Sequence, residues 1–150
     1  MARPNAIKAA REQVEAYNVG DWRRLKAAFA PGAIYNEMGT QRRMRGASRI
    51  VQAYQEWKLA SPDSRGTIIS SLARGNVVVQ EIVWKGTHTG TLEGPAGPIR
   101  PSGKPISVPS VQIVTVQNGK IKTVREYFNL LTLLQEIGAA SAVVEPSHPS

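Results

Sequence analysis

The sequence predicts an α+β domain in which N-terminal helices pack on one face of a curved antiparallel sheet. Apolar residues recur at three- and four-residue spacing through the first 60 positions, and alternating strands fill residues 67–128. The dipeptide Asn118-Gly119 suits a two-residue type I′ hairpin turn, because both of its positions need a positive φ. Helices followed by hairpin-connected strands are typical of the α+β class.

Three helices are expected before the sheet. Asn5 is a candidate cap for the first helix, which ends at Gly20. Asp21 begins the second, with Trp22, Leu25 and Phe29 on its buried side and Pro31-Gly32 as its end. The third helix is expected over residues 47–60, because Ser61-Pro62 would stop it.

The strands are expected at residues 33–37, 67–74, 77–89, 105–117 and 120–128. Residues 39–45 are expected to form a basic loop, and residues 90–104 an irregular connection, because that stretch is rich in proline and glycine. A short helix should begin at Asn129 and stop at Gly138. We therefore expect one domain over residues 1–138, and a flexible C-terminal tail over residues 139–150.

Composition excludes several classes of function. The chain has 150 residues, 41% hydrophobic and 20% charged, which suits one globular domain. It has no cysteine, and His88 and His148 lie far apart, so we expect no metal site. The net charge of +8 comes from scattered residues, which does not favour nucleic acid as a partner. No signal peptide or membrane span is apparent, and we expect a cytoplasmic protein.

Two stretches carry a resemblance to a known family. The chain ends its last strand with Gly119-Lys120-Ile121, Tyr127-Phe128 and Asn129, followed by Leu133-Leu134-Gln135-Glu136-Ile137-Gly138. The run Gly86-Thr87-His88-Thr89-Gly90 matches the Gly-Thr-His-Thr-Gly signature residue for residue. These motifs resemble the SnoaL-like polyketide cyclases, a family of ester cyclases within the NTF2-like superfamily. The resemblance spans about residues 6–138 and implies an NTF2-like cone, with one internal pocket and no cofactor.

Asn129 stands where the resemblance implies a catalytic Asp. An amide cannot accept a proton at neutral pH, although it can form hydrogen bonds. Three interpretations remain open: another carboxylate or His88 has taken over the role, the protein binds without turnover, or the Asn is an introduced replacement that traps a complex. Asn129 is also a suitable cap for the last helix.

Three further residues are candidates for proton transfer. Glu37 is the leading replacement base, because a carboxylate at that strand end should face the pocket, although an exposed loop position is an equal alternative. Glu81 lies on the face of its strand opposite to Gln80, and the outer face is favoured. His88 either contacts substrate or binds the loop that follows it.

The remaining candidates are aromatic and polar side chains that could bind a flat substrate. The resemblance implies a phenol at Tyr17 aimed at a substrate oxygen, and Arg125 shares the strand parity of Asn129. The full set of candidate substrate-binding residues is Tyr17, Tyr35, Tyr54, Trp57, Trp84, Gln112, Arg125 and Tyr127.

The expected function is a cofactor-free cyclisation by intramolecular aldol chemistry, or an isomerisation, of a polyketide-like or polycyclic carbonyl compound. The alternatives are a non-catalytic module that binds small molecules and an epoxide hydrolase-like enzyme. The resemblance also implies a homodimer. The expected partner is a hydrophobic or aromatic small molecule, with no nucleic acid and no membrane.

Overall fold

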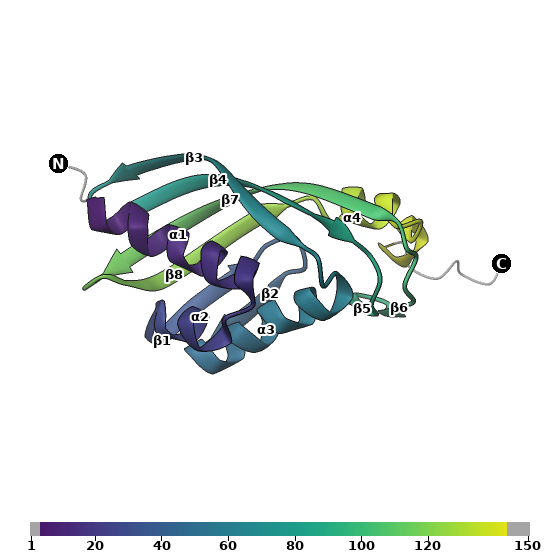
Figure 1. Ribbon diagram of the computed structural model, residues 1–150, viewed down its shortest axis with the longest axis horizontal. Helices are drawn as coiled ribbons and strands as arrows, with labels where there is room; N and C mark the ends of the chain where they lie inside the picture. The colour runs from purple at the N-terminus through teal and green to yellow at the C-terminus, as the bar shows by residue number, and fades with distance from the viewer. Residues whose placement is uncertain (1–3, 144–150) are drawn as a thin grey trace.

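The computed structural model describes residues 4–143 and has the expected α+β architecture. Three helices, α1 (Pro4–Val19), α2 (Trp22–Ala27) and α3 (Ala47–Ala60), lie on one side of a strongly curved sheet, as Figure 1 shows. A short helix α4 (Leu130–Glu136) and a 3₁₀-helix (Ala140–Val143) lie at the far end of the sheet.

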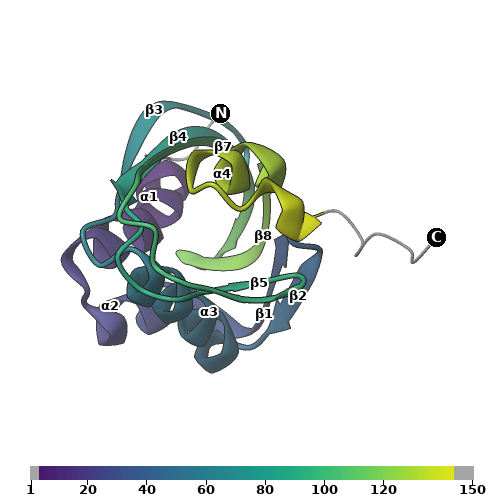
Figure 2. The same cartoon turned by 90° about the vertical axis from the view of Figure 1, so that its right-hand side faces the viewer.

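The main sheet has six strands in the order β2-β1-β8-β7-β4-β3. Their bounds are β1 (Phe29–Glu37), β2 (Arg42–Arg45), β3 (Arg65–Arg74), β4 (Val77–Thr87), β7 (Pro105–Gln117) and β8 (Lys120–Phe128). All neighbouring pairs are antiparallel except β1 and β8, which are parallel. A separate hairpin of β5 (Leu92–Gly94) and β6 (Gly97–Ile99) crosses near α3 (Figure 2).

The expected bounds of the third helix and of the last two strands are confirmed, and most other differences are small. Phe29 does not belong to the second helix: it begins β1 and is buried beside β8, so the apolar residue reaches the core from a strand. Pro31 and Gly32 lie in that strand at an irregularity between Phe29 and Ile34, where the missing N–H of proline is tolerated.

Four other expectations need correction. Asn5 lies inside α1, because the helix already begins at Pro4, a residue suited to the first turn. The expected basic loop contains β2, which pairs with β1, and the connection at 90–104 contains the β5–β6 hairpin. The expected tail includes the 3₁₀-helix at 140–143, and its last seven residues, 144–150, lie outside the described part of the chain.

The core fills the concave side of the sheet. One apolar cluster joins α1, α2 and α3 to the inner faces of β1, β4, β7 and β8, and a second lies under α4. Together, the helices and the curved sheet form the expected cone (Figure 2). Within residues 4–143, no helix is both long enough and apolar enough to cross a membrane.

Candidate active site

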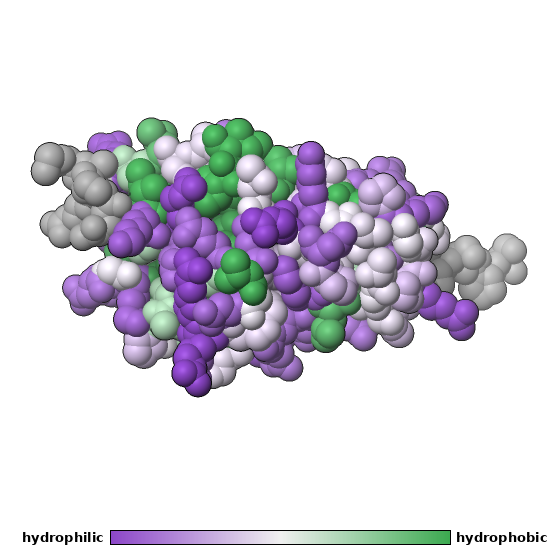
Figure 3. All heavy atoms as spheres, viewed as in Figure 1, coloured by the Kyte–Doolittle hydropathy of each residue, from purple (hydrophilic) through white to green (hydrophobic). Residues whose placement is uncertain are grey.

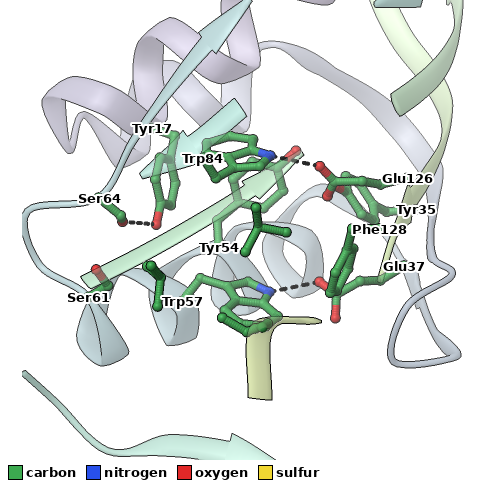
Figure 4. A pocket seen from close by; sticks show the side chains of 13 residues that line it. Tyr17, Tyr35, Glu37, Tyr54, Trp57, Ser61, Ser64, Trp84, Glu126 and Phe128 are labelled. Atoms are coloured by element: carbon green, nitrogen blue, oxygen red, sulfur yellow. Dashed lines mark hydrogen bonds between the residues drawn. The ribbon is translucent and has the colours of Figure 1, made fainter. Parts of the chain in front are cut away.

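A partly open cavity of about 90 Å³ lies between α3 and the concave face of the sheet. Its walls are mostly aromatic and aliphatic, with two carboxylates, Glu37 and Glu126, among the lining residues (Figure 4). Tyr17, Tyr54 and Tyr35 meet in edge-to-face contacts, with ring centroids 5.9 Å and 5.5 Å apart for the successive pairs. Such contacts hold the rings in place, so the cavity has a defined shape.

Glu126 is a buried carboxylate that extends inward from β8. It is 7% exposed, and Glu37 is 3% exposed. The Tyr35 hydroxyl donates to its Oε1 at 2.5 Å, while the Trp84 indole N–H at 3.1 Å and the Ser110 hydroxyl at 3.0 Å donate to its Oε2. All three donors are neutral, so among residues 4–143 Glu126 has hydrogen-bond partners but no cation paired with it.

Burial raises the pKa of Glu126 above its ordinary value, and the nearby charge of Glu37 acts in the same direction. The donors Tyr35, Ser110 and Trp84 oppose this shift without reversing it. A carboxylate with a raised pKa is a stronger base once it is ionised, and a raised pKa is typical of groups that exchange protons near neutral pH. Glu126 is therefore suited to accept and return a proton inside the cavity.

Glu37 lies beside Glu126 but has different partners. The two residues are register partners on the parallel strands β1 and β8. Glu37 forms an ion pair with Arg42 at 3.0 Å and accepts from the Trp57 indole at 2.8 Å and the Thr40 hydroxyl at 2.5 Å. Arg42 also reaches Glu56, at 2.7 Å. These contacts tie Glu37 to the cavity wall, and the prediction that it faces the pocket is confirmed.

Tyr17 and Ser64 form a hydroxyl pair at the opposite wall. Their oxygens lie 2.6 Å apart, and burial raises the pKa of Tyr17 to about 12, so its phenol stays protonated at neutral pH. The Lys58 ammonium lies 4.4 Å from the centre of the Tyr17 ring. The pair offers neutral hydrogen-bond donors to an oxygen placed in the cavity.

Asn129 does not enter the cavity, so the expectation that its amide protrudes into the pocket is wrong. Its side chain is exposed at the start of α4, where Oδ1 accepts from the Thr132 backbone N–H at 3.2 Å. This is the capping role that asparagine fills well. The absence of an Asp at this position therefore says nothing about the chemistry of the cavity.

Glu81, Arg125 and Tyr127 are also outside the cavity. Glu81 is exposed on the outer face of β4 and accepts from the Ser70 hydroxyl at 2.8 Å. Arg125 is exposed and Tyr127 is 42% exposed, because both point away from the inner face of β8. The outer face favoured for Glu81 is confirmed, so Glu81 does not act at the site, and the places proposed for Arg125 and Tyr127 at the site are wrong.

His88 is buried but does not line the cavity. Its Nδ1 accepts from the Ser102 backbone N–H at 3.1 Å, and its own backbone bonds to Lys104 and Gly103. Desolvation lowers the pKa of His88, so it is neutral at pH 7. His88 therefore closes the base of the loop that carries β5 and β6, as the structural alternative supposed.

The other aromatic candidates do gather at the cavity: Tyr17, Tyr35, Tyr54, Trp57 and Trp84. Gln112 is fully buried behind the cavity wall and contacts Tyr35 and Glu126, so it does not touch the space that a substrate would fill. Among the described residues, no cluster of three or more histidine or acidic side chains has the arrangement of a metal site.

Sequence reasoning missed Glu126 because it took the inner face of the last strand from Asn129, whose parity Arg125 and Tyr127 share. In the structure Asn129 caps α4, Arg125 and Tyr127 are exposed, and Glu126 is the buried residue between them. The signal was present in Val124 and Phe128, apolar residues two positions before and after Glu126. Those neighbours identify the inner face directly.

Comparisons with known proteins agree with the fold. The SnoaL-like polyketide cyclase family model matches residues 7–137. A SnoaL-like protein from Jannaschia sp. CCS1 has a similar structure, with a TM-score of 0.81, 18% identity and coverage of 93% of this chain and 97% of that chain. A comparison with curated proteins found no match.

Two further solved structures show the same fold. IdmH from Streptomyces antibioticus has a TM-score of 0.76 and 22% identity, covering 89% of this chain and 98% of that chain. An LEH-like epoxide hydrolase from M. tuberculosis has a TM-score of 0.69 and 20% identity, covering 93% and 96%. Because the family model covers most of the chain, this protein belongs to the SnoaL-like polyketide cyclase family.

Proposed function

We propose that the protein catalyses cofactor-free proton transfer at a carbon next to a carbonyl group, with Glu126 as the general base. The observation that supports this most is the buried Glu126 carboxylate, which has a raised pKa and lies in a largely aromatic cavity, with no described cation paired with it. General base catalysis by one positioned group typically contributes about 10²- to 10⁴-fold. The substrate class that fits such walls is an aromatic or polycyclic carbonyl compound.

The proposed reaction moves one proton out and back. Glu126 takes a proton from the α-carbon, and the electron pair of that C–H bond forms an enolate. The Tyr17 and Ser64 hydroxyls are placed to donate to a substrate oxygen on their side of the cavity. The enolate carbon then attacks a second carbonyl of the same molecule, and the proton on Glu126 passes to the new alkoxide. In an isomerisation, the proton would instead return to a different carbon.

The test is hydrogen exchange in D₂O with a panel of aromatic β-keto esters, followed by mass spectrometry and NMR. We expect enzyme-dependent deuterium incorporation at the α-carbon, and a ring-closed product where the probe carries a second carbonyl. Glu126→Gln should remove both signals, and the exposed carboxylate variant Glu81→Gln should retain them. Exchange that persists in Glu126→Gln would contradict the assignment of the base.

A second candidate is epoxide hydrolysis. The cavity holds two carboxylates, and Arg42 is paired with one of them, which is the type of set that could activate a water and protonate an epoxide oxygen. Incubation with styrene oxide in H₂¹⁸O distinguishes this function, because hydrolysis would give a diol carrying one ¹⁸O atom. A protein that binds aromatic probes but is silent in both assays would instead be a binding module.

We also propose that two copies associate through the outer face of the sheet. Ile69 and Leu72 of β3 are 62% and 73% exposed, and Val79 lies beside Leu72 on β4. Apolar groups gather over this part of the sheet in Figure 3. Light scattering of Leu72→Lys should then show a monomer where the unmodified protein is a dimer.

A further inference from the structure

Three glutamine side chains lie buried between α1 and the sheet, behind the cavity. Gln13 comes from α1, Gln80 from β4 and Gln112 from β7, and each is 0% exposed. Their neighbours along the two strands are the buried apolar residues Val78 and Val114. Burying amides among apolar groups is unfavourable unless they form hydrogen bonds, so simple packing would be served better by aliphatic side chains.

The hydrogen bonds of these amides determine which way Gln112 faces. Gln13 donates to the Gln112 Oε1 at 2.7 Å, and Gln80 donates to the same oxygen at 3.0 Å. Both amides also donate to the backbone carbonyl of Ala10, at 3.1 Å in each case. With its oxygen occupied by two donors, Gln112 must present its NH₂ group on the other side.

That NH₂ group faces the catalytic candidates. The Gln112 Nε2 lies 3.5 Å from the Tyr35 hydroxyl and 3.5 Å from the Glu126 Oε2. Reversed, the amide would place a partly negative oxygen beside a carboxylate, which is repulsive. The orientation observed therefore favours the ionised form of Glu126. It also places the same NH₂ group beside the Tyr35 hydroxyl, which donates to Glu126.

Gln80 makes this arrangement at a cost. Its Oε1 is buried and has no hydrogen-bond partner within the described part of the chain. A buried polar atom without a partner is uncommon and destabilising. The Gln80 NH₂ group thus donates to the Ala10 carbonyl and to the Gln112 Oε1, although the Gln80 oxygen is left without a partner among the described residues.

We propose that Gln112 is a positioning residue for Glu126, and that Gln13 and Gln80 fix the direction in which its amide faces. The inference rests on the proposed role of Glu126 as the base. A purely structural role for the three amides would require them to stabilise the fold, and would leave the behaviour of Glu126 unaffected by their replacement.

Other groups near Glu126 must be held constant in a test. The charged or titratable groups that face it are Glu37 and Tyr35 from β1, Tyr54 from α3 and Tyr17 from α1. From β4 and β7 it meets only the neutral Trp84 and Ser110, besides Gln112. Replacing Gln112 or Gln80 by methionine changes none of these charges and keeps a similar side-chain length.

The experiment is an NMR titration of the Glu126 side-chain carboxyl carbon in ¹³C-labelled protein, assigned with Glu126→Gln. Loss of a donor to the carboxylate favours its protonated form, so Gln112→Met should move the titration to higher pH by on the order of half a unit to one unit. Gln80→Met should move it in the same direction by less. Gln117→Met, an exposed position on the same strand, should leave it unmoved.

The result that overturns the proposal is an unmoved Glu126 titration in a folded Gln112→Met protein. Should Gln112→Met fail to fold, Gln80→Met decides, because it does not touch Glu126 and removes an unsatisfied oxygen. An unmoved titration in Gln80→Met would then reject the proposal. If Glu126 in the unmodified protein titrates at the ordinary value of a glutamate, the proposal that Glu126 is the base fails instead. This measurement therefore distinguishes a failure of the proposed function from a failure of the proposed role of Gln112.

Discussion

Glu37 and Glu126 occupy paired positions on neighbouring parallel strands, and their surroundings differ sharply. Glu37 is bound to the cation of Arg42 and is fixed further by Trp57 and Thr40. Glu126 meets only neutral donors, and burial raises its pKa. Two carboxylates in one cavity can take separate roles when their environments differ in this way. The difference supports the proposal that Glu126 transfers the proton, while Glu37 acts on it through its charge.

The largest expected effect comes from removing each carboxylate in turn. Glu126→Gln should lower kcat on the active carbonyl probe by about 10²- to 10⁴-fold, because it deletes the base. The geometry can survive: the new amide oxygen can accept from Trp84 and Ser110, and its NH₂ can donate to Tyr35. Glu37→Gln should cost on the order of tenfold or less, because it changes the neighbouring charge rather than the base. Steady-state kinetics would contradict this ranking if Glu37→Gln proved the more damaging change.

A pH profile can sharpen the same comparison through Arg42. The rate should rise with pH as Glu126 ionises, along a limb displaced upward from that of an ordinary glutamate, because its pKa is raised. Glu37→Gln removes a charge that raises this pKa, so the limb should move to lower pH. Arg42→Met leaves Glu37 less compensated and should move the limb to higher pH.

At pH values below the pKa of Glu126, each unit by which that pKa moves changes the rate by about tenfold. Arg43→Met, an exposed neighbour on β2, is the matched control and should leave the profile in place. If Glu37→Gln and Arg42→Met moved the limb of the pH profile in the same direction, charge could not be the cause of the shifts.

Replacing Glu126 by glutamine should raise the stability of the protein at pH 7, although it lowers the activity. Because the folded pKa of Glu126 is raised above the ordinary 4.5, folding with an ionised Glu126 is unfavourable at neutral pH. Glu126→Gln should therefore raise the Tm at pH 7, and the gain should disappear as the pH falls below 4.5. For a chain of this size, each 1 kcal/mol corresponds to about 2–4 °C. Thermal melts at pH 4 and pH 7, with Glu81→Gln as the control, would contradict this if Glu126→Gln were the less stable protein at pH 7.

The smallest expected effects are at Asn129. Asn129→Asp should leave activity unchanged, since the side chain is exposed and Asp caps a helix equally well. Asn129→Ala should lower the free energy of unfolding by about 1 kcal/mol, with kcat unchanged. Denaturant unfolding and the carbonyl assay together measure both. A large gain of activity in Asn129→Asp would indicate that the base belongs at position 129, and would contradict the assignment of Glu126 as the base.

The sequence was sufficient for the fold class and for most elements, because hairpin turns and apolar periods are local signals. Glu37 was found for the same reason, as a carboxylate at the end of a short strand. Glu126 was missed because the inner face of β8 was inferred from Asn129, which lies beyond the strand and caps α4. The proposed role of Arg42 depends on its contact with Glu37, 5 positions away in sequence. That of Gln112 depends on its contact with Glu126, 14 positions away. No local pattern in the sequence predicts either contact.

Each of the two carboxylates accepts a hydrogen bond from the indole of a different tryptophan, Trp57 for Glu37 and Trp84 for Glu126. Indole fluorescence is sensitive to charge close to the ring, so the protein contains its own optical reporter for each acid. With Trp22 and one of these two replaced by phenylalanine, emission would follow the remaining partner alone. Occupancy of the cavity and ionisation of its acids could then be observed before any natural substrate is identified.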